Sequence, residues 1–108
     1  MTAPLTDLIA VAKVKMDALE RDIEGAVCKY AVTRGMLHYK FTSPARAAVP
    51  DRLFINQHGK AFMVEFKRHG KKPTPAQDRE IAKLRAQNVN VFVVDNVDDG
   101  RAVVDMMV

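Results

Sequence analysis

Apolar and polar residues alternate along the middle of the chain, and this alternation predicts β-strands. It runs through positions 36–43, and two more apolar stretches, at 52–56 and 61–67, flank the polar sequence QHGK. Because the side chains of a strand point alternately to its two faces, this spacing predicts a strand followed by a hairpin. A further stretch, 90–95, is almost continuously apolar, as expected of a short strand that is covered on both faces.

Apolar positions spaced three and four residues apart predict helices on both sides of these strands. This spacing runs from 17 to 34 and ends at Gly35, a residue type that often terminates helices in a left-handed conformation. A second helix is predicted over 75–87, because Thr74 suits the N-cap position and a proline follows it. A short helix is predicted over 98–108. The predicted order is therefore α-β-β-β-α-β-(α).

This order predicts an α/β fold with a mixed β-sheet flanked by helices. The chain has 108 residues, of which 48% are hydrophobic, and this is enough for one small domain. We place that domain at 17–108 and expect a separate helical segment at 1–16. The apolar positions of this segment are too dense for a helix surrounded by water, so it is expected to pack on the domain or on another chain. The segment is a candidate dimer contact.

The turn of the predicted hairpin determines which residues face each other. If residues 57–59 form a three-residue loop with Gly59 in the left-handed position, Asp51 lies opposite Glu65. A two-residue loop would break this register. In the three-residue register, Lys67 shares a face with Glu65, and the apolar residues that alternate with them enter the core. Two acids and a lysine then converge on one patch.

Two carboxylates directly across a sheet repel each other, and this arrangement favours a cation between them. Mg²⁺ binds through one or two carboxylates and keeps several of its waters. The ammonium of Lys67 beside such an ion would orient a water or stabilise charge that develops on a phosphate. The alternative is an exposed sheet face on which Glu65 and Lys67 form a solvated pair that contributes little to stability. The spacing alone leaves both interpretations open.

The charge of the chain is compatible with a polyanionic partner. The formal net charge is +4, and basic residues cluster in sequence around the two acids. The candidate phosphate contacts, which would bind DNA without a sequence preference, are Lys40, Ser43, Arg46, Arg52, Arg68, Lys71 and Lys72. A solubilising basic surface is the alternative for each basic residue. Tyr30 and Tyr39 are expected in the core rather than as surfaces on which bases stack.

The single cysteine, Cys28, excludes an intrachain disulfide and a zinc cluster built from cysteines. A reducing compartment fits this composition, and we expect a cytoplasmic protein. The N-terminal sequence lacks the basic start and the unbroken apolar core of a signal peptide. Apolar stretches also fall short of the length of a membrane span, so no membrane partner is expected.

Asp51 follows a proline and residues 65–67 read Glu-Phe-Lys, so the hairpin matches the PD-(D/E)xK nuclease signature. The context is more specific, because it adds an acidic first helix, the loop SPARAAVPD and the helix start TPAQ. From about 19 to 94 the chain resembles the VRR-NUC (virus-type replication-repair nuclease) domain, particularly its small stand-alone versions in phages and bacteria. The resemblance implies a restriction-endonuclease-like core. The loop departs from the family pattern, because it carries alanines where members usually have glycines.

The resemblance implies a role for each residue of the acidic patch. Asp51 and Glu65 would bind the divalent metal, and the backbone carbonyl of Phe66 would also reach it. Lys67 would assist the nucleophilic water. The expected metal is Mg²⁺ or Mn²⁺.

The resemblance also implies a metal-binding glutamate on the first helix and a glutamine near the active site. Glu20 and Glu24 are both candidates for the glutamate, because they are four residues apart and share one helix face. The sequence alone does not distinguish Glu20 from Glu24 as the metal-binding glutamate. Gln77 matches the glutamine, and its alternative is an ordinary residue in the first turn of a helix.

The combined expectation is a metal-dependent endonuclease that hydrolyses phosphodiester bonds in structured DNA. The small stand-alone domains of the family are similar to Holliday-junction resolvases, which act as homodimers, and a two-fold dimer suits two symmetric cuts in a four-way junction. One alternative is a non-catalytic DNA-binding accessory module of the same fold, and another is a flap or end-processing nuclease. The complete set of Asp51, Glu65 and Lys67 argues against the accessory module. The expected setting is the cytoplasm of a bacterial or phage-infected cell.

Overall fold

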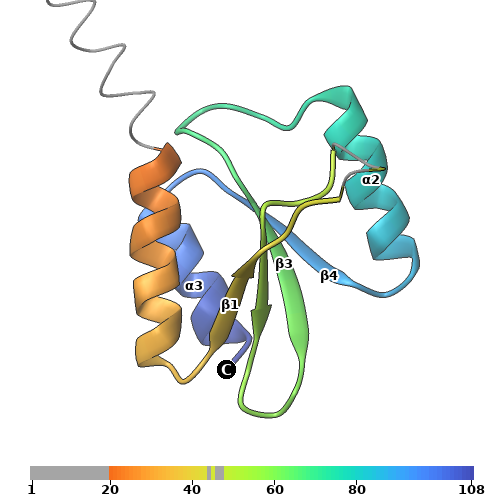
Figure 1. The fold of residues 1–108 in the computed structure, drawn as a ribbon. Helices are drawn as coiled ribbons and strands as arrows, with labels where there is room; N and C mark the ends of the chain where they lie inside the picture. The colour runs from red at the N-terminus through yellow and green to blue at the C-terminus, as the bar shows by residue number, and fades with distance from the viewer. Residues whose placement is uncertain (1–19, 44, 46–47) are drawn as a thin grey trace, which may run out of the picture.

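Four strands form one mixed sheet in the order β1-β2-β3-β4, and helices lie on both of its faces (Figure 1). The structure is a computed structural model and describes residues 20–43, 45 and 48–108. The strands are β1 (Leu37–Lys40), β2 (Arg52–Ile55), β3 (Ala61–Phe66) and β4 (Asn90–Val94). The first three pair in antiparallel fashion, whereas β4 runs parallel to β3. A parallel neighbour requires a crossover, which α2 (Pro75–Ala86) provides.

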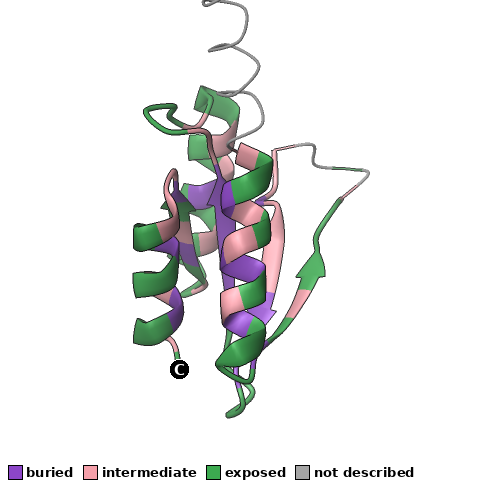
Figure 2. Cartoon of the chain, turned by 90° about the vertical axis from the view of Figure 1, so that its left-hand side faces the viewer, coloured by how far each residue is buried: buried purple, intermediate pink, exposed green. Residues whose placement is uncertain are grey.

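Each face of the sheet has its own core. The first helix, described over residues 20–33, and α3 (Val97–Met106) cover one face, and the core beneath them includes Val27, Phe62 and Val104. The other face carries a smaller core beneath α2. This core consists of Met63, Ile81 and Val91, with Leu53, Leu84 and Val89 packed against it. Buried residues accordingly lie on the central strands and on the inner sides of the helices (Figure 2).

The predicted fold class and the predicted order of helices and strands are confirmed. The first helix ends where the sequence indicates: Gly35 has a φ of 80°, and the N–H of Met36 donates to the carbonyl of Ala31 at 3.0 Å. This left-handed ending satisfies a carbonyl of the last turn. The segment 1–16 and its proposed role as a dimer contact lie outside the described residues.

The hairpin between β2 and β3 has the predicted three-residue loop. The N–H of Asn56 donates to the carbonyl of Lys60 at 2.9 Å, and Gly59 has a φ of 77°. The side chain of Asn56 accepts hydrogen bonds from the N–H groups of His58 and Lys60, so it braces the loop from inside. It also donates to the carbonyl of Met107 at 2.7 Å. The register counted from this loop holds along both strands.

The helix α2 begins as predicted. The hydroxyl of Thr74 accepts from the N–H of Gln77, and the side chain of Gln77 accepts from the N–H of Thr74, which forms a capping box. Pro75 occupies the first helical position, and Asn88, with a φ of 65°, follows the end of the helix. Neither this helix nor any other in the described part of the chain combines the length and the apolar character needed to cross a membrane.

The edge strand β1 is more exposed than its sequence predicts. Tyr39 is 51% exposed, so its predicted place in the core is wrong, whereas Tyr30 packs against the larger core as expected. The reason is the position of α2, which packs on β3 and β4 and reaches β2 only at Leu53. The face of β1 that carries Tyr39 is therefore left open, as the exposed strand at the side of Figure 2 shows.

Candidate active site

Asp51 and Glu65 lie together where β2 begins and β3 ends. Arg52 pairs with Val64, so one further step of the same register places Asp51 opposite Glu65. The Oδ2 atom of Asp51 accepts a hydrogen bond from the N–H of Phe66 at 3.1 Å, and this bond holds the Asp51 side chain against the end of β3. The role of the Phe66 carbonyl as a metal ligand stays a prediction.

Glu65 is an acid with almost no access to water. Only 2% of its surface is exposed. Its Oε1 atom accepts from Nε2 of Gln77 at 3.0 Å and lies 3.4 Å from Nζ of Lys67. Its Oε2 atom is buried and has no hydrogen-bond partner among the described residues. A buried carboxylate oxygen without a partner is costly, so this atom indicates a place for a ligand.

The pKa values of Asp51 and Glu65 are both raised, and burial is the main cause for each acid. Burial raises the pKa of Glu65 to about 7, and the charge of Asp51 adds to this rise while Lys67 opposes it. Burial also raises the pKa of Asp51, against the hydrogen bond from the Phe66 N–H. A divalent cation beside both carboxylates would reverse these shifts. Carboxylate oxygens are ligands that Mg²⁺ and Mn²⁺ prefer, so the unpaired Oε2 atom and its neighbour Asp51 fit such an ion.

The pairing of β3 with β4 holds Lys67 beside Glu65. Its side chain is only 15% exposed, although it follows the last residue of β3. Its backbone N–H donates to the carbonyl of Val94 at 2.9 Å, so the pairing of the two strands extends to this residue. The result is an ammonium group with little freedom next to the acid pair.

The two glutamates of the first helix have different surroundings. Oε1 of Glu24 accepts hydrogen bonds from Nε of Arg52 at 2.6 Å and from Nζ of Lys40 at 3.2 Å. Burial favours the neutral acid, but these bonds hold the pKa of Glu24 below its ordinary value. Glu20 is half-buried, and its charge adds to the rise that burial and Asp51 cause in the pKa of Glu65. The structure thus separates two residues that the sequence leaves equivalent.

No three His, Cys, Asp or Glu side chains lie close enough together to hold one metal ion, within the part of the chain that the structure describes. Asp51 and Glu65 therefore form a pair, and Glu20 acts on Glu65 through its charge. A pair is sufficient for Mg²⁺, because this ion usually binds one or two carboxylates and keeps several waters.

Gln77 connects α2 to the acid pair. Its Oε1 atom completes the helix cap, while its Nε2 atom donates to Oε1 of Glu65. One amide therefore fixes both the start of the helix and the orientation of the buried carboxylate. The capping box is visible in the sequence, whereas the contact with Glu65 depends on how α2 lies across β3.

Lys40 and Arg52 do not accompany the acid pair. They lie opposite each other on β1 and β2, on the sheet face covered by the first helix, where both pair with Glu24. This cluster, which we call the Glu24 clamp and which consists of Glu24, Lys40 and Arg52, was not expected from the sequence. The sequence does contain a signal for the Glu24 clamp, because the strand register places Lys40 and Arg52 on one face of the sheet.

Three of the other predicted phosphate contacts, Arg68, Lys71 and Lys72, lie in the loop after β3, and Ser43 lies in the segment after β1. The loop after β3 is anchored by the N–H of Gly70, which donates to Oδ2 of Asp95 at 3.0 Å. Lys71 and Lys72 are exposed, and Ser43 and Arg68 are half-buried. Arg46 lies outside the described residues. Their roles in DNA binding stay predictions.

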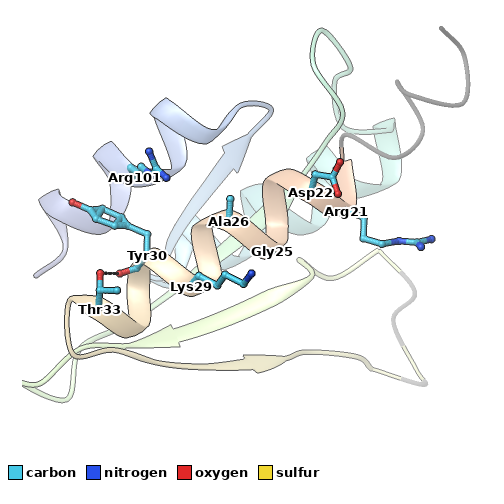
Figure 3. Close-up of a pocket in the computed structure, with 8 residues that line it drawn as sticks. All are labelled: Arg21, Asp22, Gly25, Ala26, Lys29, Tyr30, Thr33 and Arg101. Carbon is cyan, nitrogen blue, oxygen red and sulfur yellow. Dashed lines mark hydrogen bonds between the residues drawn. The ribbon is translucent and has the colours of Figure 1, made fainter. Parts of the chain in front are cut away.

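A hollow of about 520 Å³ lies away from the acids, between the first helix and α3 (Figure 3). Its lining consists of Arg21, Asp22, Gly25, Ala26, Lys29, Tyr30, Thr33 and Arg101. The guanidinium of Arg101 lies 5.5 Å from the centre of the Tyr30 ring, and the Tyr30 hydroxyl donates to Asp105 at 2.6 Å. Asp22 supplies the one carboxylate of this lining, so the acid pair is the better candidate for catalysis.

The chain was compared with known proteins at three levels. No family model matches the sequence. The chain is 42% identical, over 85 residues, to "Putative nuclease p44" of Acyrthosiphon pisum secondary endosymbiont phage 1, and the match covers 79% of this chain and 87% of that protein. Its fold is similar to a solved VRR_NUC domain, with a TM-score of 0.75 and 29% identity, over 80% of this chain and 94% of the other. Together with the buried acid pair, these similarities show that the chain belongs to the VRR-NUC family of nucleases.

Proposed function

We propose that the protein is a metal-dependent DNA endonuclease in which Asp51 and Glu65 hold Mg²⁺ or Mn²⁺. One observation carries the proposal: the Oε2 atom of Glu65 is buried, unpaired among the described residues and next to a second carboxylate. Such an atom is unfavourable in an ordinary sheet and favourable beside a cation. The bound ion would polarise a phosphoryl oxygen and lower the pKa of water.

The other residues of the site would keep this pair ready for catalysis. Gln77 and Lys67 both engage Oε1 of Glu65, which leaves Oε2 directed to the ion. The ammonium of Lys67 would orient the attacking water and stabilise the charge that develops on the phosphate. Because these side chains are buried or held by hydrogen bonds, little reorganisation would be needed when the substrate binds.

We assign the role of the first-helix acid to Glu20. The charges of both glutamates act on the acid pair, Glu20 on Glu65 and Glu24 on Asp51, but Glu24 is already engaged by Arg52 and Lys40 on the face of the sheet covered by the first helix. Glu24 would instead anchor the helix that carries Glu20. Because no third acid of the described residues lies close enough to share one ion with the pair, Glu20 would act through a water of the ion.

Branched DNA is the substrate we propose, with a homodimer that cuts a four-way junction in a bacterial or phage-infected cell. The phage origin of the relative supports the setting. The exposed Lys71 and Lys72 in the loop after β3 support contact with phosphates. A dimer would present two sites related by a two-fold axis, as two symmetric cuts require.

Cleavage of labelled DNA tests the proposal. A four-way junction, a flap and a linear duplex of equal length are incubated with Mg²⁺ or Mn²⁺. We expect Asp51→Asn, Glu65→Gln and Lys67→Ala each to lower the rate by about a hundredfold or more. Asp22→Asn, an exposed acid of the first helix, is the matched control and should cleave like the unaltered protein.

The outcomes separate the candidate functions. Activity that survives both Asp51→Asn and Lys67→Ala would contradict the assigned site. Binding of the junction without cleavage would favour the non-catalytic accessory module. Cleavage of the flap but not of the junction would favour an end-processing nuclease.

A further inference from the structure

Three large apolar side chains are exposed on the edge strand β1 and the residue after it. Leu37 is 58% exposed, Tyr39 is 51% exposed and Phe41 is 38% exposed. They alternate along the chain, so they share one face of the sheet. We call these three residues the β1 row. Exposed apolar residues that gather in this way usually mark a binding surface.

The β1 row lies on the same face as the acid pair. Tyr39 is paired with Leu53, which in turn is paired with Met63, two residues before Glu65 on β3. The N–H of Phe41 donates to the carbonyl of Asp51 at 2.8 Å, so Phe41 directly adjoins that acid in the sheet. The core beneath α2 reaches no further than Leu53. The row is thus an uncovered extension of the candidate active site.

Distances within a sheet place the row within reach of the DNA strand whose phosphate would lie at the acid pair. Neighbouring strands are about 4.8 Å apart, so Phe41, two strands away from Glu65, is separated from it by roughly 10 Å. Stacked nucleotides advance by about 3.4 Å each along a strand. A base about three nucleotides from the phosphate at the acid pair would therefore reach the row.

We propose that Tyr39 and Phe41 form a stacking surface for unpaired bases about three nucleotides from the scissile phosphate, and that this surface gives the enzyme its preference for branched DNA. This inference rests on the proposed nuclease function. Aromatic side chains stack on any base that is exposed. The bases of an intact duplex are stacked on one another and are not accessible, whereas those at a branch point are easily unstacked.

Continuity with the acid pair indicates which molecule occupies the row. Whatever binds with its phosphate at Asp51 and Glu65 must extend across this face, and a nucleotide joins a charged phosphate to an apolar ring. The row matches that order: acids first, then Phe41 beside Asp51, then Tyr39. A second copy of this chain on the open edge is the competing occupant, and the experiment is designed to distinguish the two.

The test uses leucine substitutions, which keep an apolar surface but remove the ring. Phe41→Leu and Tyr39→Leu are compared with Val32→Leu, a control at an exposed position of the first helix. Cleavage of the four-way junction and of the linear duplex is measured for each variant. We expect the two ring-removing variants to lower the junction-to-duplex ratio by about tenfold, whereas the control should keep the ratio of the unaltered protein.

Two further measurements do not depend on cleavage. Four-way junctions with 2-aminopurine beside the branch point are bound in Ca²⁺, and stacking on a ring should quench the fluorescence of the unaltered protein more than that of the leucine variants. Sedimentation reports the oligomeric state. Equal quenching and an equal junction-to-duplex ratio in all variants would overturn the inference.

The same measurements identify the competing occupant and keep the two proposals apart. If Phe41→Ser and Tyr39→Ser dissociate an oligomer while Phe41→Leu and Tyr39→Leu preserve full junction preference, a second copy covers the row and the inference is wrong. If the unaltered protein cleaves no DNA but quenches 2-aminopurine through these rings, the nuclease proposal fails and the stacking surface stands. Cleavage without any preference for branched DNA would also overturn the inference.

Discussion

Glu65 affects both the stability of the fold and the chemistry of the candidate active site. It lies near the end of the inner strand β3 and is almost completely buried, yet it carries a carboxylate with one oxygen that has no hydrogen-bond partner among the described residues. Burial and the adjacent Asp51 both raise its pKa, so a proton or a cation is required to relieve the site at neutral pH. The free energy of unfolding should therefore depend on pH and on the presence of a divalent cation.

We predict that the metal-free protein becomes less stable as pH rises from the ordinary glutamate pKa of 4.5 to the pKa of about 7 of Glu65. In this range the folded state retains a proton that the unfolded state has released, so the free energy of unfolding falls with rising pH. The fall contributed by Glu65 is at most about 3 kcal/mol. Urea unfolding in EDTA at a series of pH values measures it.

Glu65→Gln is the control for this pH dependence. It cannot ionise, so its stability should fall less over the same range, and the remaining slope would come from Asp51, whose pKa is also raised. Mg²⁺ should restore the stability of the unaltered protein at neutral pH and leave Glu65→Gln less affected. A stability that rises with pH in EDTA would contradict the buried, uncompensated acid.

At the scale of elements, the first helix carries two acids with different partners. Glu24 joins the helix to β1 and β2 through the clamp, and the charges of both acids act on the acid pair, Glu20 on Glu65 and Glu24 on Asp51. The Glu24–Arg52 pair of the clamp is largely shielded from water, because these side chains are 15% and 23% exposed, whereas the side chain of Lys40 is 54% exposed. An ion pair in such surroundings is costly to break from one side.

We predict opposite effects for the two helix acids. Glu24→Gln should lower the free energy of unfolding by about 1–3 kcal/mol, because it leaves Arg52 without a charged partner. Glu20→Gln should leave stability almost unchanged and remove most of the nuclease activity. Urea unfolding and junction cleavage, measured on both variants, check this. A stable Glu24→Gln together with a fully active Glu20→Gln would reverse the assignment.

The contact between the first helix and α3 depends on a glycine. A Cβ at Gly100 would collide with the side chain of Val27 and press on Val94. We predict that Gly100→Ala destabilises the protein by about 1–3 kcal/mol through overpacking, although alanine is the better helix former. Thermal unfolding measures the change.

Gly25 is the matched control for this helix contact. It lies in the first helix, and a Cβ added there would have no neighbour within 4 Å, so Gly25→Ala should stabilise the protein by about 0.5–1 kcal/mol. Equal effects at the two glycines would show that helix propensity, rather than close packing at Gly100, determines the outcome.

At the scale of the whole molecule, one face of the sheet is closed and the other is only partly covered. The first helix and α3 cover one face, whereas α2 leaves the β1 side of the other face open beside the acid pair. The site is consequently built at the border between a buried core and an accessible surface. This border would let a substrate approach over β1 while Glu65 remains buried.

We predict that the protein is a homodimer at micromolar concentration and that removal of residues 1–16 yields a monomer. The apolar positions of this segment are too dense for a helix in water, so another surface is expected to cover them. Sedimentation of both chains measures their masses, and circular dichroism shows whether the shortened chain still folds. A monomeric full chain would contradict the dimer, and a shortened chain that remains dimeric would place the contact elsewhere.

Much of the fold could be predicted because its signals are local. Alternation defines the strands, Gly59 determines the loop length and hence the register, and Thr74 with Gln77 marks the start of α2. The position of Asp51 opposite Glu65 follows from that register alone. These features depend on neighbours in the sequence, where steric and hydrogen-bonding rules act over a few residues.

Other features were decided by tertiary structure. The choice between Glu20 and Glu24 depends on how the first helix is rotated over the sheet, and the exposure of Tyr39 depends on where the cover of α2 ends. These contacts join segments that are distant in the chain, and several packings are compatible with the same local pattern.

The hairpin and its two acids could thus be predicted from the sequence itself, because a period of two and one left-handed glycine bring them together once the loop has three residues, as the structure confirms. The unpaired oxygen of Glu65, the Glu24 clamp and the open row on β1 were decided only when the helices packed on the sheet. Burial is a property of the assembled fold, and burial is what leaves the carboxylate oxygen of Glu65 without a partner, which is the observation that supports the proposed cation site.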